Sequence, residues 1–286
     1  MRRKLREIIK DLLKDTLPPN YIDLLPSNYQ RIGDIIIVAL DEKLVPYESI
    51  IGDAILKKFG NVRTVCRKLK GISSELRLPS VKVIAGDKNT ITIHRENNCL
   101  YKLDVAKVMF AKGNAKERRR VAQLVREGEV VVDMFAGIGY FTIPIAVLAK
   151  PSKIYAIDLN PVSIDFLKEN IKLNGVEKKV IPILGDCREV VQKLGSIADR
   201  VIMGYIPNTY KFIPYALKVV KRTGGIIHYH DIAKQEDLFE KPINTLKEAI
   251  LKHNFNIKIL YRGIVKSYAP KVYHIVIDVF VKPALA

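Results

Sequence analysis

Acidic side chains follow three apolar segments in the second half of the chain, each where a strand is expected to end. They are Asp133 after residues 130–132, Asp158 after residues 153–157 and Asp186 after residues 180–185. The carboxyl ends of parallel strands meet at one edge of a sheet, so we expect these carboxylates to lie close together. Carboxylates at such an edge can accept hydrogen bonds from ribose hydroxyls and from an adenine amino group, or they can cap the helices that follow.

A glycine turn follows the first of these acids. The segment Asp133-Met-Phe-Ala-Gly137-Ile-Gly139-Tyr predicts a strand, a tight turn and a helix, in which glycines let the backbone approach a ligand. A dinucleotide site would need a third glycine, and Thr142 stands in its place. That departure weighs against a bound pyrophosphate, and therefore against NAD. The remaining ligand with an adenosine and no phosphate is S-adenosylmethionine, and a tight turn without any ligand is the simpler alternative.

Strands and helices alternate after about residue 108. We predict strands at 130–135, 153–158, 180–185, 200–203, 225–230, 257–264 and 272–281. We predict helices at 115–126, 161–174, 188–194, 210–221 and 243–253. Apolar strands that alternate with amphipathic helices indicate an α/β fold with a parallel sheet covered on both faces.

The first 108 residues follow another pattern and predict a smaller α+β domain. An amphipathic helix is expected over residues 1–17, ended by Pro18-Pro19, and a second helix over 48–59. One strand is expected over 32–40. Three short strands at 81–85, 90–94 and 99–104 are expected to form a small antiparallel sheet. The domain boundaries that we predict are 1–108, an RNA-binding α+β domain, and 109–286, a catalytic domain that binds the cofactor.

The chain of 286 residues carries a net charge of +18, which predicts a polyanionic partner. A basic surface on a heat-adapted protein is the alternative. One basic cluster comprises Lys57, Lys58, Arg63, Arg67, Lys68, Lys70, Arg77 and Lys82, with Glu75 as the acid within it. A second comprises Lys107, Lys112, Lys116, Arg118, Arg119, Arg120 and Arg126. No apolar run is long enough for a membrane span, and three scattered cysteines fit a reducing cytoplasm.

Residues 90–232 resemble the family of tRNA-modifying enzymes that contains the guanine-N1 tRNA methyltransferases and the wybutosine-synthesis aminocarboxypropyltransferases. The motifs that carry the resemblance are His94-Arg-Glu-Asn, Asp104-Val-Ala-Lys-Val, Glu117-Arg-Arg-Arg-Val, Val132-Asp-Met-Phe-Ala-Gly-Ile-Gly-Tyr-Phe, Ala156-Ile-Asp-Leu-Asn-Pro, Lys168-Glu-Asn-Ile-Lys-Leu-Asn, Gly185-Asp-Cys-Arg-Glu and Gly224-Gly-Ile-Ile-His-Tyr-His. The resemblance implies a Rossmann-like class I methyltransferase fold with a mostly parallel seven-stranded sheet, S-adenosylmethionine as cofactor and tRNA as partner.

The loop after residue 203 separates the two branches of this family. The methyltransferases carry an Asn-Leu-Pro-like tripeptide there, whereas this chain reads Met203-Gly-Tyr205-Ile-Pro207 and lacks the Asn. Gly139-Tyr140 also resembles the other branch, because the methyltransferases tend to have Gly-Pro. The resemblance therefore implies transfer of the 3-amino-3-carboxypropyl group of S-adenosylmethionine to a carbon of the tricyclic wyosine precursor, next to the anticodon of phenylalanine tRNA.

The resemblance also implies roles for individual residues. Asp158 would bind the ribose, and Asp186 and the backbone of Cys187 would bind the adenine. Arg118 would pair with the cofactor carboxylate or orient the base, and Tyr205 and Tyr140 would stack on the base. The full set of expected cofactor-binding residues is Ala111, Arg118, Phe135, Gly137, Asp158, Leu159, Asp186, Cys187 and Met203. The expected catalytic residues are Arg118, Tyr205 and Pro207.

Three other functions stay open at this point. One is a guanine-N1 tRNA methyltransferase of the same fold, and another is an RNA-binding protein with a degenerate cofactor site and no catalysis. A dinucleotide oxidoreductase is the third alternative, and the sequence favours it least. His228 and His230 share one face of a strand, but no third ligand is evident, so no metal is expected. We expect a monomer without a membrane anchor.

Overall fold

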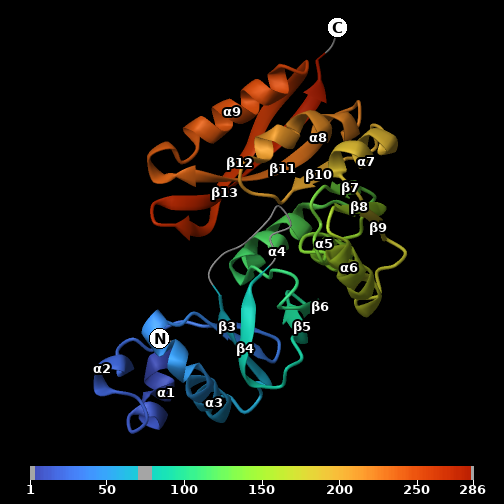
Figure 1. Ribbon diagram of the computed structural model, residues 1–286. Coiled ribbons are helices and arrows are strands. Elements are labelled where there is room, and N and C mark those ends of the chain that lie inside the picture. Colours follow the sequence, from blue (N-terminus) through green and yellow to red (C-terminus); the bar gives the residue numbers. More distant parts are fainter. Residues whose placement is uncertain (1–3, 70–78, 285–286) are drawn as a thin grey trace. The chain divides into compact units, whose positions relative to one another are not determined.

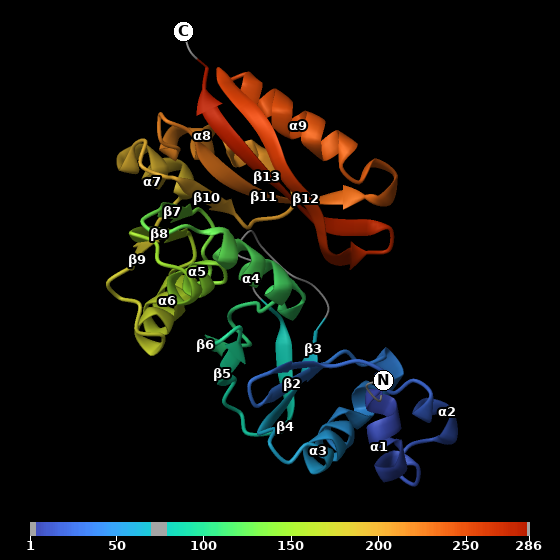
Figure 2. The ribbon, with the colours of Figure 1, turned by 180° about the vertical axis from the view of Figure 1, so that it is seen from behind.

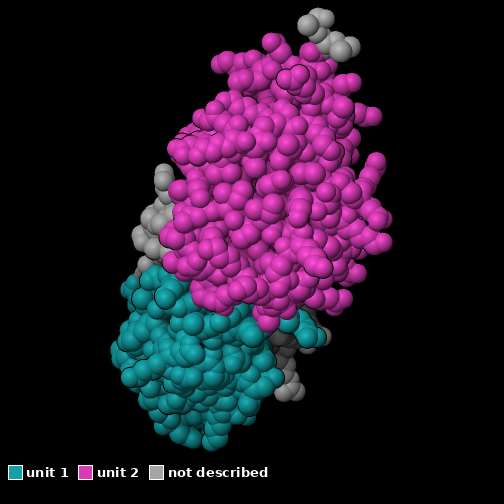
Figure 3. Space-filling view, turned by 90° about the vertical axis from the view of Figure 1, so that its right-hand side faces the viewer, with its two compact units in different colours: residues 1–95, 100–110 teal, residues 96–99, 111–286 magenta. Residues whose placement is uncertain are grey.

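The computed structural model describes residues 4–69 and 79–284, and these form two compact units (Figure 3). The first unit comprises residues 1–95 and 100–110, and the second comprises residues 96–99 and 111–286. Lys70, Glu75 and Arg77 of the first basic cluster lie outside the described residues. Within the described ranges, no helix combines the length and apolarity that crossing a membrane requires.

The first unit contains a sheet in the order β1-β2-β3-β4, with helices packed against it. Its helices are α1 (Leu5–Leu13), α2 (Pro19–Ile22), η1 (Glu42–Tyr47) and α3 (Glu48–Lys58). Its strands are β1 (Gln30–Ile32), β2 (Ile35–Val38), β3 (Thr64–Lys68) and β4 (Val81–Gly86). A two-stranded sheet of β5 (Ile91–Glu96) and β6 (Cys99–Asp104) follows along the chain.

Two strand predictions for this unit are wrong. The strand predicted over 32–40 is shorter and forms only β2 over 35–38, because Gly33 turns the chain with φ +54° and leaves Ile32 in β1, which pairs antiparallel with β2. The three-stranded sheet expected from 81–104 does not form. Instead, β4 pairs antiparallel with β3, a strand that the sequence did not predict, and β3 pairs parallel with β2.

The basic residues of this unit are in part neutralised by acids from other elements. Arg63 binds Asp34 at 3.0 Å and Asp87 at 2.9 Å. Glu48 at the start of α3 forms an ion pair with Arg67 at 2.6 Å and accepts a hydrogen bond from Lys82 at 2.5 Å. The hydrogen bond from Lys82 and the charges of both cations lower the pKa of Glu48. The charge of the cluster is therefore smaller than the sequence suggested. Among its described members, Lys57, Lys58, Lys68 and Lys82 are exposed, and Lys82 is paired with Glu48.

The second unit contains the alternating elements that the sequence predicted. Its helices are η2 (Lys112–Asn114), α4 (Ala115–Leu124), α5 (Thr142–Leu148), α6 (Pro161–Leu173), α7 (Cys187–Leu194), η3 (Thr209–Phe212), α8 (Ile213–Val219), η4 (Gln235–Asp237) and α9 (Glu240–Leu251). Its strands are β7 (Val130–Asp133), β8 (Lys153–Asp158), β9 (Val180–Leu184), β10 (Arg200–Met203), β11 (Gly225–Lys234), β12 (Phe255–Ala269) and β13 (Val272–Pro283).

The seven strands form one sheet in the order β12-β13-β11-β10-β7-β8-β9. Strands β7 to β11 are parallel to one another, and β13 lies antiparallel between β11 and β12. Helices α4, α5 and α6 lie on one face and α7, α8 and α9 on the other, as both ribbon views show (Figures 1 and 2). The prediction of a mostly parallel seven-stranded sheet is confirmed. The order changes direction at β7, and ligands of such folds bind outside the strand ends at this point.

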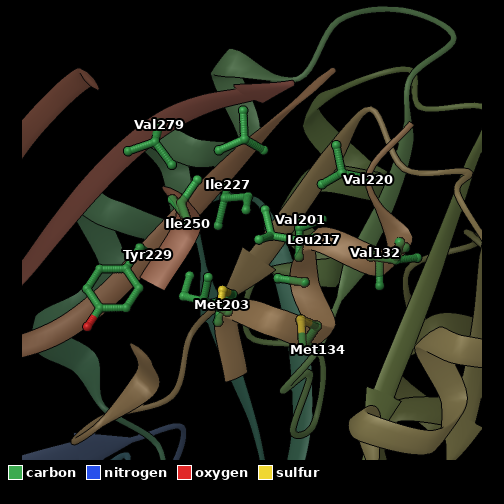
Figure 4. Close-up of a cluster of buried hydrophobic side chains, with 14 of the residues drawn as sticks. Val132, Met134, Val201, Met203, Leu217, Val220, Ile227, Tyr229, Ile250 and Val279 are labelled. Atoms are coloured by element: carbon green, nitrogen blue, oxygen red, sulfur yellow. The ribbon is translucent and has the colours of Figure 1, made fainter. Parts of the chain in front are cut away.

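Apolar side chains from the central strands and from α7, α8 and α9 form the larger core (Figure 4). Val132, Val201 and Ile227 come from three neighbouring parallel strands, and all are fully buried. Their residue types suit strands covered on both faces, where apolar residues follow one another without alternation. This packing fixes the carboxyl ends of β7, β8 and β10, where the predicted site residues lie.

Candidate active site

The glycine turn and the second acid form one hydrogen-bonded unit. The amide of Gly137 donates to Oδ2 of Asp158 at 2.7 Å, and the amide of Asn160 donates to Oδ1 at 2.9 Å. Gly137 has φ +55°, a conformation that side chains disfavour, and a Cβ there would lie 2.3 Å from the ring of Tyr140. Burial raises the pKa of Asp158. A carboxylate has about four acceptor positions, so Asp158 keeps acceptor capacity for a ligand.

Asp133 holds the turn from inside and is not a ligand-binding acid. Its side chain is 0% exposed, and it accepts from Thr142 Oγ1 at 2.8 Å and from the Phe135 amide at 3.3 Å. Thr142, in the place of the third glycine, therefore fixes the start of α5 to the end of β7. Burial raises the pKa of Asp133 to about 7.

Asp186 caps helix α7 at the end of β9. Its side chain accepts from the Arg188 amide at 2.8 Å and forms an ion pair with the Arg188 guanidinium. The hydrogen bond from that side chain lowers the pKa of Asp186. A ligand at Asp186 thus competes with Arg188. Cys187 is buried, and burial raises the pKa of its thiol to about 12, so a reactive thiolate is excluded at neutral pH.

Exposed apolar side chains stand beside these acids. Leu159 follows Asp158 and is 52% exposed, and Leu184 precedes Gly185-Asp186 and is 55% exposed. Strands β8 and β9 are neighbours, with Asp158 paired to Leu184 in register. The two leucines therefore offer apolar surface next to Asp158, of the kind that a purine ring requires.

Three aromatic rings gather at the ends of β7 and β10. The rings of Phe135 and Tyr205 stack with centroids 5.1 Å apart and an interplanar angle of 28°. Phe212 packs edge-on against both, at 4.9 Å from Phe135 and 5.8 Å from Tyr205. Two other predicted residues of this region are placed differently: the side chain of Met203 is buried in the core, and Pro207 follows a cis peptide bond.

The loop that carries Tyr205 is tied to the neighbouring strand β11. Asp231 accepts from the amide of Asn208 at 3.0 Å and from the hydroxyl of Tyr229 at 2.5 Å. Thr209 Oγ1 donates to the carbonyl of Tyr205. Asn208 adopts a left-handed conformation with φ +65°. These bonds position the aromatic ring of Tyr205 beside Phe135.

Arg118 is held by a carboxylate of the same unit. Its side chain is 1% exposed, and it donates to Glu96 Oε1 at 2.7 Å and to Glu96 Oε2 at 2.9 Å. It also donates to the carbonyl of Ala111 at 3.1 Å. The guanidinium of Arg118 is therefore already bound by protein acceptors. Burial and the charge of Asp158 raise the pKa of Tyr140, and the charge of Arg118 opposes this shift.

The two histidines of the strand β11 motif belong to a buried polar cluster. His228 Nε2 lies 2.7 Å from Arg200 Nη1, and His228 Nδ1 lies 2.6 Å from Asp278 Oδ1. The arginine guanidinium only donates hydrogen bonds, so Nε2 accepts from Arg200. The N–H at Nδ1 then donates to Asp278. His230 pairs with His274 at 3.0 Å. Among residues 4–69 and 79–284, no group of three or more ligating side chains could hold a metal ion.

The sequence analysis missed three residues of this region. Glu96 lay in a motif that carried the family resemblance, but its spacing gave no sign that it binds Arg118. Phe212 and Asp231 lie far from the glycine turn in sequence. Only the parallel order of β7, β10 and β11 brings their elements together.

Comparisons with known proteins identify the family of the chain. A family model described as the TRM5/TYW2 methyltransferase domain matches residues 92–259, and one described as the TYW2 N-terminal domain matches residues 9–90. A tRNA(Phe) (4-demethylwyosine(37)-C(7)) aminocarboxypropyltransferase of Methanocaldococcus jannaschii is 44% identical over 87% of this chain and 96% of its own length. A tRNA (guanine(37)-N(1))-methyltransferase, Trm5b of Pyrococcus abyssi, is 40% identical over 92% of this chain and 77% of its own.

The solved structures show the same fold. The structure of P. horikoshii TYW2 in complex with MeSAdo has a TM-score of 0.86 and 38% sequence identity, and the match covers 98% of this chain and 100% of that one. The expected class I methyltransferase-like fold and the family resemblance are thereby confirmed. The chain belongs to the TRM5/TYW2 family.

Proposed function

We propose that the chain transfers the 3-amino-3-carboxypropyl group of S-adenosylmethionine to a carbon of 4-demethylwyosine, next to the anticodon of tRNA(Phe). The aminocarboxypropyltransferase of M. jannaschii, at 44% identity, supports this function. The match of residues 9–90 to the TYW2 N-terminal domain favours the same branch.

The observation that carries the proposal is the stacking of Tyr205 on Phe135. The methyltransferase branch has an Asn before the Leu-Pro, whereas here Tyr205 stands before Ile206-Pro207. An amide at this point would offer hydrogen bonds to the edge of a guanine. An aromatic wall offers a flat apolar surface instead, which suits a larger tricyclic base that stacks.

The residues of the glycine turn fit the cofactor. Asp158 has the acceptor capacity for two ribose hydroxyls, and Gly137 lets the backbone pass close to the ligand. Leu159 and Leu184 supply apolar surface for the adenine, and the backbone of Cys187 lies at the start of α7 beside them. When bound, S-adenosylmethionine supplies a sulfonium that activates the carbons attached to it.

The chain selects among those carbons by placement. In the transfer, the base carbon forms a bond to the arm carbon beside sulfur. The S–C bond breaks with its electron pair left on sulfur, methylthioadenosine departs, and the base carbon gives up a proton to water. In-line alignment is required, and misalignment costs orders of magnitude in rate. Tyr205 and Phe135 orient the base, and Arg118 positions the Ala111 segment next to the arm.

tRNA is the partner of this family, and the net charge of +18 suits it. We propose that the N-terminal unit contacts the tRNA through Lys57, Lys58 and Lys68, which are exposed. Selectivity for phenylalanine tRNA, a monomeric state and a cytoplasmic location stay predictions, as do the domain roles.

One reaction tests the proposal. The chain is incubated with S-adenosylmethionine and tRNA(Phe) that carries 4-demethylwyosine, and the nucleosides and the small product are read by mass spectrometry. We expect a base enlarged by one aminocarboxypropyl group and one equivalent of methylthioadenosine. A matched tRNA with unmodified guanosine at the same position should give neither product.

Methyl transfer is the second candidate, because the methyltransferase of P. abyssi is 40% identical to this chain. It predicts a methylated guanosine on the unmodified tRNA and release of adenosylhomocysteine. That pair of products would replace the proposed function. No product on either tRNA would favour the non-catalytic alternative.

A further inference from the structure

The second unit contains a half-buried lysine, Lys266, that has no acidic partner among the described residues. Lys266 lies on strand β12, where it pairs in register with His274. No carboxylate within residues 4–69 and 79–284 forms an ion pair with it, although most half-buried charges in proteins are paired. The side chain is only partly exposed, so its ammonium group loses part of its hydration without compensation.

A glycine makes room for this side chain. A Cβ at Gly113 would lie 2.9 Å from Lys266 Cδ and 3.8 Å from its Nζ. Gly113 belongs to η2, which connects Ala111 to the start of α4 at Ala115. The ammonium group therefore lies near η2, directly after Ala111. The carbonyl of Ala111 accepts a hydrogen bond from Arg118.

Positive charge accumulates at this end of the site. Burial and the charge of Arg118 lower the pKa of Lys266, so the two cations lie close enough to repel each other. Glu96 neutralises Arg118, and Lys266 remains as the uncompensated charge. The N-terminus of α4, with its partial positive charge, begins in the same segment.

Contacts within the second unit connect this position to the cofactor turn. Tyr140 lies against Gly137, and the charges of Asp158 and Arg118 both act on its pKa. The groups that interact electrostatically thus run from Asp158 through Tyr140 to Arg118 and Lys266. A ligand whose adenosine lies at Asp158 extends along this series with its other end.

We propose that Lys266 is a substrate-binding residue whose ammonium group binds an oxyanion, either the carboxylate of the aminocarboxypropyl arm or a phosphate beside the modified nucleotide. The inference rests on the proposed function, from which it takes these two ligands. The absence of a side chain at Gly113 makes room for Lys266. Glu96 pairs with Arg118, so the ammonium group of Lys266 is the charge available to the ligand. The residue lies outside the motifs that carry the family resemblance.

Binding measurements on the full chain test this without turnover. Lys266→Met is compared with wild type, with Lys266→Arg, and with Lys258→Met, an exposed lysine on the same strand. Each protein is titrated with S-adenosylmethionine, with methylthioadenosine, which lacks the carboxylate, and with tRNA(Phe) at several salt concentrations. Thermal melts establish that the variants are folded.

If the ligand is the carboxylate, Lys266→Met weakens S-adenosylmethionine binding about ten- to a hundredfold and leaves methylthioadenosine unchanged. If it is the phosphate, tRNA binding weakens, and the slope of log K against log salt falls by about 0.7 to 0.9. Lys266→Arg restores most of the loss in either case.

Two outcomes overturn the proposal: equal losses for S-adenosylmethionine and methylthioadenosine, or effects no larger than those of Lys258→Met. These titrations are independent of the product. An unexpected product would overturn the proposed function and leave the role of Lys266 measurable, because both transfer reactions use a donor with the same carboxylate.

Discussion

The amide of Gly137 donates a 2.7 Å hydrogen bond to Oδ2 of Asp158, so the turn after β7 and the acid at the end of β8 form one rigid unit. Neither part would hold its position alone. The glycine needs an acceptor for an amide that faces the sheet edge, and the acid needs donors once it is half-buried. A ligand that binds Asp158 therefore meets a carboxylate that is already oriented.

Replacing Asp158 should weaken cofactor binding more, the fewer acceptor oxygens the new side chain keeps. Asp158→Asn keeps one acceptor oxygen and should reduce the affinity for S-adenosylmethionine about tenfold, and Asp158→Ala should reduce it about a hundredfold. Titration with labelled S-adenosylmethionine measures both. Asp165→Asn, an exposed acid on α6, is the control and should bind as wild type. Unchanged affinity in Asp158→Ala would remove the ribose assignment.

The aromatic wall gives a second prediction. Tyr205→Ala removes the ring that stacks on Phe135, and stacking of a base on an aromatic ring contributes about 1 to 3 kcal/mol. We expect kcat/KM for precursor-bearing tRNA to fall about five- to a hundredfold, with the affinity for S-adenosylmethionine unchanged. Tyr205→Phe keeps the ring and should stay near wild type. If Tyr205→Phe loses as much activity as Tyr205→Ala, the hydroxyl and not the stacking is what matters.

The second unit was predictable because local runs of apolar residues mark its strands. Runs such as Val130-Val-Val and the glycines after them determine a parallel sheet and the place of its ligand edge. The first unit was harder to predict, because β3 carries Arg67 and Lys68, and such residues are typical of a charged surface. Arg67 pairs with Glu48 on helix α3, and no local sequence pattern reveals that ion pair.

The same limit applies to the site. Asp158 and Gly137 follow from spacing, because the strand–turn–helix unit fixes both. The partners of Arg118 do not, since Glu96 and the Ala111 carbonyl come from separate segments of the chain. Asp133 and Asp186 look like Asp158 in the sequence. Burial makes Asp133 a structural acid, and Arg188 forms an ion pair with Asp186.

Asp133 predicts a pH dependence of stability. Burial raises its folded-state pKa to about 7, whereas a carboxyl in the unfolded chain titrates at about 3.9. Between these values the folded chain holds a proton that the unfolded chain has lost. The free energy of unfolding should therefore fall as the pH rises from about 4 to about 7.

Denaturant unfolding at several pH values tests this. Asp133→Asn has no titrating group at this position and should show a smaller decline over the same window. The exposed acid Asp165 provides the control, because Asp165→Asn should keep the wild-type slope. Identical slopes in Asp133→Asn and wild type would show that Asp133 does not bind the extra proton.

The ion pair of Arg118 and Glu96 predicts a large effect on stability. Glu96→Gln leaves a guanidinium that is 1% exposed without its counter-charge, which typically costs about 3 to 5 kcal/mol of unfolding free energy. The matched control is Glu127→Gln, which removes the partner of Lys150 in a pair whose side chains are 77% and 76% exposed. Surface pairs contribute about 1 kcal/mol or less. Urea unfolding compares the two, and equal losses would mean that the buried pair is not strongly coupled.

The exposed lysines of the first unit give the last prediction. Lys57 and Lys58 lie in the last turn of α3, and both are exposed, whereas Arg63, Arg67 and Lys82 are bound by acids. If the N-terminal unit contacts phosphates, these two lysines are free to do so. Each phosphate contact that is lost lowers the slope of log K against log salt by about 0.7 to 0.9.

The double change Lys57→Glu and Lys58→Glu should therefore weaken tRNA binding most at low salt, where unscreened charges count most, and should flatten the salt dependence. Affinity for S-adenosylmethionine should not change, because the variant alters only the phosphate contacts. The charge-preserving pair Lys57→Arg and Lys58→Arg should bind tRNA as wild type does. A salt slope that stays at the wild-type value in the Glu variant would place the phosphate contacts elsewhere, and the basic residues of α4 would then be the next to test.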